Sequence, residues 1–143
     1  MQINQEGLEL VKFFEGFRER PYKCSAGVWT QGYGHTSNIK ENSPVITEEQ
    51  AEMWLRQDLR QAETAVHELI DVPLNINQFS ALVSFTFNVG RGNLKTSTLR
   101  KLLNKGEFLE IPEQLCRWKK AGGKVLAGLV KRRLAEAQLF MKG

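Results

Sequence analysis

A helical pattern between Thr47 and about Asp71 constrains the fold of this chain more than any other feature of its sequence. Apolar residues recur there every three or four positions, and Thr47 with Gln50 forms a capping box at the start. Pro73 stops the pattern, because a proline disfavours helical conformation in the residue before it. A helix of more than twenty residues is long for a chain of 143 residues. It can therefore join two lobes of one domain.

A second helical pattern opens the chain. Asn4 is a suitable N-cap, Glu6 falls in the first turn, and Gly16 marks the expected end, so that Glu15 lies in or near the last turn. A carboxylate is unfavourable there with respect to the helix dipole, which suggests that Glu15 is either exposed to solvent or has a function. The apolar face of this helix is expected to hold Ile3, Leu10, Phe14 and Phe17.

The segment between these two helices shows β character, with turn residues at Ser25-Ala26-Gly27 and again near Gly32 and Gly34. We expect a small hairpin over residues 22–36 and a polar loop from Thr36 to Pro44. Together with the long helix, this predicts an α+β fold that is predominantly α-helical.

The segment 78–89 can be read as a strand or as a helix, because most of its apolar residues alternate as in a strand. Its length, with Asn77 before it and Gly90 after it as caps, favours a buried helix. Further helices are expected over residues 96–104, 107–117 and 126–141, the last of them after a loop at Gly122-Gly123.

Composition excludes several classes of protein. The net charge is +4, which is compatible with an acidic polymer, but most lysines and arginines are interspersed with glutamates rather than clustered as in a DNA-reading patch. No apolar run reaches the ~20 residues that span a bilayer, and no secretory signal is recognisable. Cys24 and Cys116 are expected to be free thiols, and neither a metal nor a cofactor is expected.

Three side chains carry possible chemistry: Glu15, Cys24 and Thr30. Glu15 lies among phenylalanines, and apolar neighbours favour the protonated carboxyl that a general acid needs. Thr30 lies in a glycine-flanked strand, where its hydroxyl can orient a water or a sugar hydroxyl. Taken singly, each also has an ordinary reading: a surface glutamate, a strand threonine and a small buried cysteine.

The spacing of these residues resembles that of the phage-type lysozymes, or endolysins, of glycoside hydrolase family 24. That family's catalytic motif is a glutamate, eight residues, an aspartate or cysteine, five residues, and a threonine, which Glu15, Cys24 and Thr30 match. The resemblance covers nearly the whole chain. Residues 78–90 are similar to the family's central helix, and Trp118, Gly122, Arg132-Arg133 and Glu136 are similar to its C-terminal signature.

The resemblance implies a single lysozyme-like domain over residues 1–143. Its N-terminal lobe, about 1–60, would hold the catalytic residues, and its helical C-terminal lobe would span about 70–143. The implied activity is hydrolysis of the β-1,4 bond between N-acetylmuramic acid and N-acetylglucosamine in peptidoglycan. Implied sugar contacts are Gly34, Thr36, Phe87, Asn88 and Thr98.

Cys24 replaces the aspartate that most familiar members carry. A free thiol has a pKa of about 8.5, so only about 3% is thiolate at pH 7, whereas an aspartate is almost fully ionised. Cys24 can act as a base with a lowered pKa, attack the sugar as a nucleophile, or help Thr30 to hold a water. We expect Glu15 to be indispensable and Cys24 to contribute less.

Other residues in the matching segments have two readings each. The resemblance implies a structural His35 paired with an acid in the long helix. Trp29 and Tyr33 are packing or sugar-facing aromatics. Arg132 and Arg133 either face the cleft or muropeptide carboxylates, or form a solvated helix face.

Two rival functions remain at this stage. A lytic transglycosylase needs one glutamate and often no second carboxylate, and it forms 1,6-anhydro products. A non-catalytic wall-binding or nucleic-acid-binding protein is suggested only by the charge. We expect a monomer with peptidoglycan as substrate, no nucleic-acid partner and no stable membrane insertion. It would stay in the host cytoplasm until a holin releases it to the periplasm for lysis.

Overall fold

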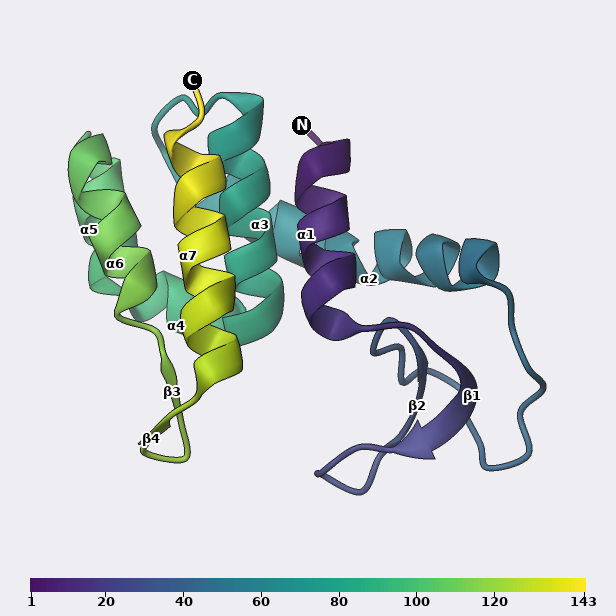
Figure 1. Ribbon diagram of the computed structural model, residues 1–143. Helices are drawn as coiled ribbons and strands as arrows, with labels where there is room; N and C mark the ends of the chain where they lie inside the picture. Colours follow the sequence, from purple (N-terminus) through teal and green to yellow (C-terminus); the bar gives the residue numbers. More distant parts are fainter. The chain divides into compact units, whose positions relative to one another are not determined.

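The computed structural model describes all residues from Met1 to Gly143. The chain divides into two compact units. The first, which we call the helical unit, comprises Met1–Val11 and Gln61–Gly143, and the second, the hairpin unit, comprises Lys12–Arg60. Helices dominate the chain, and its longer strands form a small antiparallel pair (Figure 1). The prediction of a predominantly helical α+β fold is confirmed.

The hairpin unit contains the end of helix α1 (Gln5–Glu15), strands β1 (Arg18–Lys23) and β2 (Trp29–Gly32), and the first part of helix α2 (Glu48–Leu69). The two strands pair antiparallel, with Tyr22 opposite Thr30. Strand β1 begins four residues earlier than the sequence indicates, because its first residues are charged and exposed and show no apolar alternation. The register shifts between Arg18 and Tyr22, a stretch that includes Pro21, which has no N–H to donate.

Helix α2 agrees with its predicted start and stop. The Thr47 hydroxyl accepts a hydrogen bond from the Gln50 backbone N–H at 3.1 Å, and the helix ends at Leu69, shortly before Pro73. The apolar stripe is buried as expected, except that Trp54 is half-buried. Because the helix runs through Arg60 and Gln61, it supplies residues to both units.

The helical unit consists mainly of short helices around α3 (Ile76–Val89) and α7 (Ala127–Met141), which lie side by side in Figure 1. Helix α6 (Ile111–Cys116) also packs on α7. The core is apolar and includes Phe79, Leu82, Phe85, Leu99, Leu103 and Leu115. The remaining elements are α4 (Arg91–Thr96), α5 (Thr98–Asn104), the 3-10 helix η1 (Phe108–Glu110), β3 (Lys120–Ala121) and β4 (Lys124–Val125).

Helix α3 confirms the helical reading of its ambiguous segment but corrects its N-cap. Asn75, not Asn77, caps the helix: its side chain accepts from the Gln78 N–H at 2.8 Å, and the Gln78 side chain accepts from the Asn75 N–H at 2.9 Å. Asn77 instead accepts a hydrogen bond from the side chain of Asn4 at 2.8 Å. Gly90 ends the helix with a positive φ of 93°, as its predicted role requires.

Helix α4 and the hairpin formed by β3 and β4 were not predicted. Helix α4 has only one buried residue, Leu94, so no apolar period marks it. The β3–β4 hairpin has two exposed residues in each strand, too few for an alternation to show. Its turn, Gly122-Gly123, was recognised as a loop, and both glycines have a positive φ.

Helix α1 has its predicted cap but a different buried face. The Asn4 side chain accepts from the Gly7 N–H at 2.9 Å. The buried residues are Ile3, Gly7, Leu8 and Val11, whereas Leu10 and Phe14 are half-buried and Phe17 lies beyond the helix and is exposed. A Cβ on Gly7 would lie 2.8 Å from Ile3 Cγ1 and 2.8 Å from Ser80 Cβ, so the bare glycine allows close approach to α3.

We expect Gly7→Ala to lower the free energy of unfolding. Overpacking typically costs about 1–3 kcal/mol, which outweighs the gain of up to about 1 kcal/mol from replacing a helical glycine. Gly92→Ala in α4 is the matched control, because a Cβ there meets nothing within 4 Å. Urea unfolding of both variants is the measurement, and a Gly7→Ala variant at least as stable as Gly92→Ala would contradict the close contact.

Candidate active site

Glu15 is the last residue of α1, and its carboxylate lies against the turn that follows β2. The helix ends there because Gly16 adopts a positive φ of 75°. A Cβ built on Gly34 would lie 3.1 Å from Glu15 Oε1, so the carboxylate packs over the bare backbone of Gly34. Gly34 itself has a φ of 82°, which favours glycine. The structure thus brings together the predicted acid and one predicted sugar contact.

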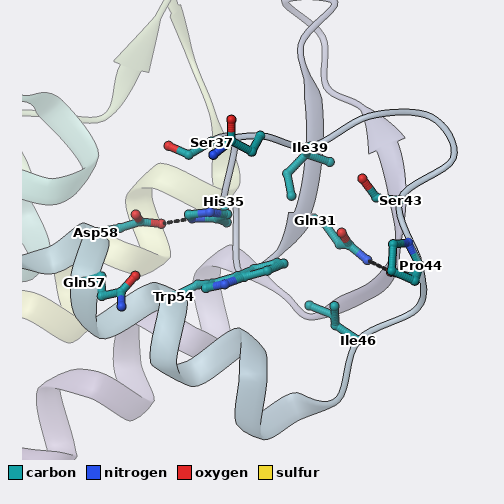
Figure 2. A pocket seen from close by; sticks show the side chains of 11 residues that line it. Gln31, His35, Ser37, Ile39, Ser43, Pro44, Ile46, Trp54, Gln57 and Asp58 are labelled. Carbon is teal, nitrogen blue, oxygen red and sulfur yellow. Dashed lines mark hydrogen bonds and ion pairs between the residues drawn. The ribbon is translucent and has the colours of Figure 1, made fainter.

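The turn that carries Gly34 is closed by a pair of backbone hydrogen bonds. Gln31 N–H donates to His35 O, and His35 N–H donates to Gln31 O, both at 2.9 Å. His35 is in turn attached to α2: its Nδ1 lies 2.8 Å from Asp58 Oδ2, and its ring stacks on Trp54 at 4.4 Å between centroids (Figure 2). The predicted pairing of His35 with an acid in the long helix is confirmed.

The end of α1 is fixed to α2 by a cluster that sequence reasoning missed. Lys12, one turn before Glu15, forms ion pairs with Glu48 at 3.2 Å and with Glu52. The Tyr33 hydroxyl donates to Glu48 at 2.9 Å. Burial alone would lower the pKa of Lys12, but the hydrogen bonds and charges of Glu52 and Glu48 raise it overall. The hydrogen bond from Lys12 lowers the pKa of Glu52.

Cys24 and Thr30 lie next to each other near the turn of the β-hairpin. The main chain of Cys24 pairs with that of Val28, with Cys24 N–H donating to Val28 O at 3.0 Å. Hydrogen bonds to the Cys24 sulfur from the backbone N–H groups of Val28 and Ala26 lower the pKa of the thiol, and Thr30 adds to the effect. These donors favour the thiolate, which is the form that can act as a base or nucleophile.

The Thr30 hydroxyl has one hydrogen and two acceptors in reach. It donates to Val28 O at 2.9 Å, and the Cys24 sulfur is its other neighbour. A thiolate attracts that hydrogen more strongly than a neutral thiol does, so ionisation of Cys24 and the orientation of Thr30 are coupled. Thr30 is 3% exposed, so its side chain is held beside the sulfur, while its hydroxyl oxygen can still accept a hydrogen bond.

The other predicted sugar contacts are dispersed along the chain. Thr36 is exposed and follows His35 in the hairpin unit. Phe87, Asn88 and Thr98 belong to the helical unit, where Phe87 is half-buried and the other two are exposed. Their contact with sugar stays a prediction.

Arg132 and Arg133 do not form a solvated helix face, which corrects one of the two readings given to them. They are 3% and 1% exposed and share a fully buried partner, Glu136. Arg132 Nε lies 3.3 Å and Arg133 Nη1 2.5 Å from its carboxylate oxygens. The signal was present in the sequence as a spacing of three and four residues on one helix.

Further polar groups of the helical unit contact this buried cluster. The Ser84 hydroxyl donates to Glu136 Oε2 at 2.6 Å, and Arg133 donates to the Trp118 carbonyl at 3.0 Å and to the Asn88 side chain. Asn88 is therefore held in place through α7. A buried charge needs such partners, since removing one of them leaves a charge without compensation.

Of the two aromatic candidates, Tyr33 is a packing residue and Trp29 stays partly exposed. Tyr33 is 6% exposed and contacts the ring of Phe17, which places it in the core. Trp29 is half-buried beneath the ammonium group of Lys23, 5.4 Å from its ring centroid. Cys24 and Cys116 are free thiols, as expected.

Comparison with known proteins identifies the class. The family model for phage lysozyme matches residues 12–136. An endolysin of Acyrthosiphon pisum secondary endosymbiont phage 1 is 46% identical over 144 residues, which cover 98% of each chain. The endolysin of Bacillus phage B103 is 45% identical over all of this chain but only 55% of its own length. The muramidase domain of SpmX from Asticaccaulis excentricus has a TM-score of 0.92, with 38% identity and 99% of both chains covered.

The fold and these matches define a lysozyme, which is a glycoside hydrolase. The chain belongs to the phage lysozyme family. The predicted function of an endolysin, or muramidase, that acts on peptidoglycan is confirmed, and the rival readings as a lytic transglycosylase or a binding protein are not favoured. A similar relative from bacteriophage PS119 is named a SAR-endolysin, so the expected dependence on a holin and the cytoplasmic location before lysis are not confirmed. No helix in the structure combines the length and apolar character needed to cross a bilayer.

We expect Gly34→Ala to reduce activity far more than its loss of stability explains. Gly106→Ala is the matched control: Gly106 has the same φ of 82° as Gly34, but a Cβ there meets nothing within 4 Å. Both variants should lose about 1–2 kcal/mol from left-handed strain. Only Gly34→Ala should displace Glu15 and lower kcat, by about 10-fold or more. Equal kcat values for the two variants would contradict the contact between Glu15 and Gly34.

Proposed function

We propose that Glu15 is the general acid of this lysozyme. In the first step its proton moves to the oxygen that links the two sugars, while the bond from that oxygen to the anomeric carbon breaks. The contact of Glu15 Oε1 with Gly34 is the observation that carries the assignment. This contact supports a carboxyl that the turn holds in one position. The turn is itself attached to α2 through His35 and Asp58.

Cys24 is proposed as the base that activates water. The water oxygen bonds to the anomeric carbon, and one of its protons goes to the thiolate sulfur, which Val28, Ala26 and Thr30 stabilise before the reaction. Thr30 would orient the same water through its hydroxyl. The lowered pKa supports this role over a purely structural one, because an ordinary thiol is only about 3% ionised at pH 7.

Attack by the Cys24 thiolate on the anomeric carbon is the second candidate mechanism. It would form a covalent glycosyl-enzyme, which water then hydrolyses with overall retention. The lowered pKa of Cys24 supports this mechanism as well as the first. Only the products distinguish the two mechanisms. A base gives inversion and no adduct, whereas a nucleophile gives retention and a covalent intermediate on Cys24.

In addition to the catalytic residues, we propose sugar contacts by family resemblance. Gly34 and Thr36 would contact sugar from the hairpin unit, and Phe87, Asn88 and Thr98 from the helical unit, within one lysozyme-like domain over residues 1–143. The anchoring of Asn88 by Arg133 supports its place in the set, because a fixed amide can orient a sugar group. The substrate is the β-1,4 bond between N-acetylmuramic acid and N-acetylglucosamine.

The route to the wall is also a proposal. We propose that the chain acts as a monomer, stays in the host cytoplasm until lysis and reaches peptidoglycan through a holin-type pore. This route is proposed from the resemblance to endolysins. Lysis of a host that expresses this chain without any pore-forming partner would contradict the proposal.

Glu15→Gln should abolish the release of soluble fragments from purified peptidoglycan, because a glutamine cannot donate the proton. The expected loss is at least about 100-fold, whereas Cys24→Ala should lose less. Mass spectrometry of the fragments is the measurement, and the wild-type products should have a reducing-end muramic acid. Products lighter by one water would indicate a lytic transglycosylase, and equal losses in the two variants would overturn the ranking of Glu15 above Cys24.

The pH profile of kcat/KM tests the role of Cys24. If the thiolate is the active form, activity rises with pH as Cys24 ionises, with a midpoint below the ordinary value of about 8.5, because the hydrogen-bond donors lower its pKa. This rise of kcat/KM with pH should vanish in Cys24→Ala. In Cys24→Asp it should move to more acid pH, because an aspartate carboxyl ordinarily ionises near a pKa of about 3.9. If the rise of kcat/KM with pH is the same in Cys24→Ala as in the wild type, ionisation of Cys24 is excluded as its cause.

A further inference from the structure

One carboxylate oxygen in the hairpin unit accepts hydrogen bonds from two side chains that lie on either side of the proposed acid. Glu48 Oε1 accepts from Lys12 Nζ at 3.2 Å and from the Tyr33 hydroxyl at 2.9 Å. Lys12 belongs to α1, and Tyr33 belongs to the turn between Gln31 and His35. The Glu48 carboxylate thus joins both of these elements to the first turn of α2.

Lys12 fixes the last turn of α1, which carries Glu15. The Gly16 N–H donates to Lys12 O at 2.9 Å, so Glu15 lies inside the turn that Lys12 begins. Residues three positions apart on a helix are neighbours on its surface, so a displacement of Lys12 also displaces the acid.

The charge of Lys12 is maintained by its partners. Its side chain is only 10% exposed, and it pairs with Glu52 as well as with Glu48. Burial opposes the charged form, but the hydrogen bonds to Glu52 and Glu48 raise the pKa of Lys12 overall. The ammonium group therefore stays charged over the pH range in which a carboxyl titrates.

Tyr33 fixes the backbone on which the acid lies. It directly precedes Gly34, and a Cβ on Gly34 would lie 3.1 Å from Glu15 Oε1. Tyr33 is 6% exposed, and its ring contacts the ring of Phe17 at 5.6 Å between centroids. A buried tyrosine whose hydroxyl has a fixed acceptor has little freedom, so the backbone that leads into Gly34 is held with it.

We propose that Glu48 is a positioning residue for Glu15: its carboxylate sets the distance between the helix end that carries the acid and the turn on which the acid lies. The inference rests on the proposed function, because it takes Glu15 to be the group that donates the proton. A misplacement of about 1 Å can cost about 100-fold in rate, so a link of this kind affects kcat even when it adds little to stability.

The exposure of Glu48 allows an effect on catalysis to be separated from an effect on folding. Its side chain is 49% exposed, and an ion pair in contact with solvent adds little to the free energy of unfolding. Its partners keep other contacts when it is removed, since Lys12 retains Glu52 and Tyr33 retains Phe17. Loss of Glu48 should therefore leave the fold intact while the acid becomes less well positioned.

Glu48→Ala and Glu49→Ala form the matched pair of variants. Both glutamates are exposed and lie in the first turn of α2, so both variants lose the same favourable interaction with the helix dipole. Glu49 makes no hydrogen bond or ion pair in the structure. With a soluble peptidoglycan glycan fragment, kcat should fall about five-fold in Glu48→Ala alone, and KM should stay within about two-fold of the wild type in both.

The conservative variant Glu48→Gln should restore most of the wild-type kcat. A glutamine has the same length as a glutamate, and its side-chain oxygen can still accept from Tyr33 and Lys12. A Glu48→Gln variant as slow as Glu48→Ala would contradict a role that depends on these hydrogen bonds.

Tyr33→Phe tests the hydrogen bond to Glu48 directly, with Tyr22→Phe as its control. Each change removes one hydroxyl and keeps the ring, and the Tyr22 hydroxyl makes no hydrogen bond in the structure. Tyr33→Phe should lower kcat by about two- to three-fold in the wild type. It should have no further effect in Glu48→Ala, because both changes break the same hydrogen bond. Losses that multiply in the double variant would show that Tyr33 acts without Glu48.

Glu15→Gln and urea unfolding, measured beside these variants, separate the possible failures. If Glu15→Gln is inactive but Glu48→Ala has the kcat of Glu49→Ala, the inference alone fails. A lower kcat in Glu48→Ala that is matched by a smaller folded fraction at the assay temperature also overturns it, because the effect is then one of stability. If Glu15→Gln retains full hydrolysis, the proposed function fails and the inference fails with it.

Discussion

The turn between Gln31 and His35 is the constraint on which the hairpin unit depends. Two backbone hydrogen bonds close it, a left-handed glycine at position 34 forms its bend, and the imidazole of His35 attaches it to α2 through Asp58 and Trp54. Glu15 reaches the same turn from α1 and lies over Gly34, where any Cβ would crowd the carboxylate. The position of the acid is therefore defined from two sides, by the end of one helix and by a turn fixed to another.

The use of a cysteine in place of a carboxylate changes how negative charge is provided. An aspartate is ionised at neutral pH without help, whereas a thiol needs donors that favour its thiolate. In this chain the donors are mostly main-chain N–H groups of the hairpin turn, from Val28 and Ala26. Because they belong to the backbone, the stabilisation depends on the shape of the turn rather than on the identity of its side chains, which explains why residues 25–28 gave no sequence signal for it.

Sequence reasoning succeeded where the determinant was local or periodic. The Thr47 cap and the length of α2, the glycine at the end of α1 and the pairing of His35 with an acid all follow from spacing along the chain or from family resemblance. It failed where tertiary contacts decided the outcome. Gly7 is buried because of Ser80 in α3, and Arg132 and Arg133 are buried because Ser84, Trp118 and Asn88 meet them in space. The link from Lys12 through Glu48 to Tyr33 was also invisible, since it depends on how the end of α1 and the turn before His35 meet α2.

The buried cluster around Glu136 has a consequence for how this sequence can evolve. Two guanidinium groups share one carboxylate inside the helical unit, and each arginine also serves backbone or side-chain acceptors on other elements. A single replacement would leave a buried charge or acceptor without its partner, so apolar substitutes are acceptable only when several of these residues change together. Descendants of this chain can therefore leave the cluster only by concerted substitutions, and one-step mutational paths away from it are closed.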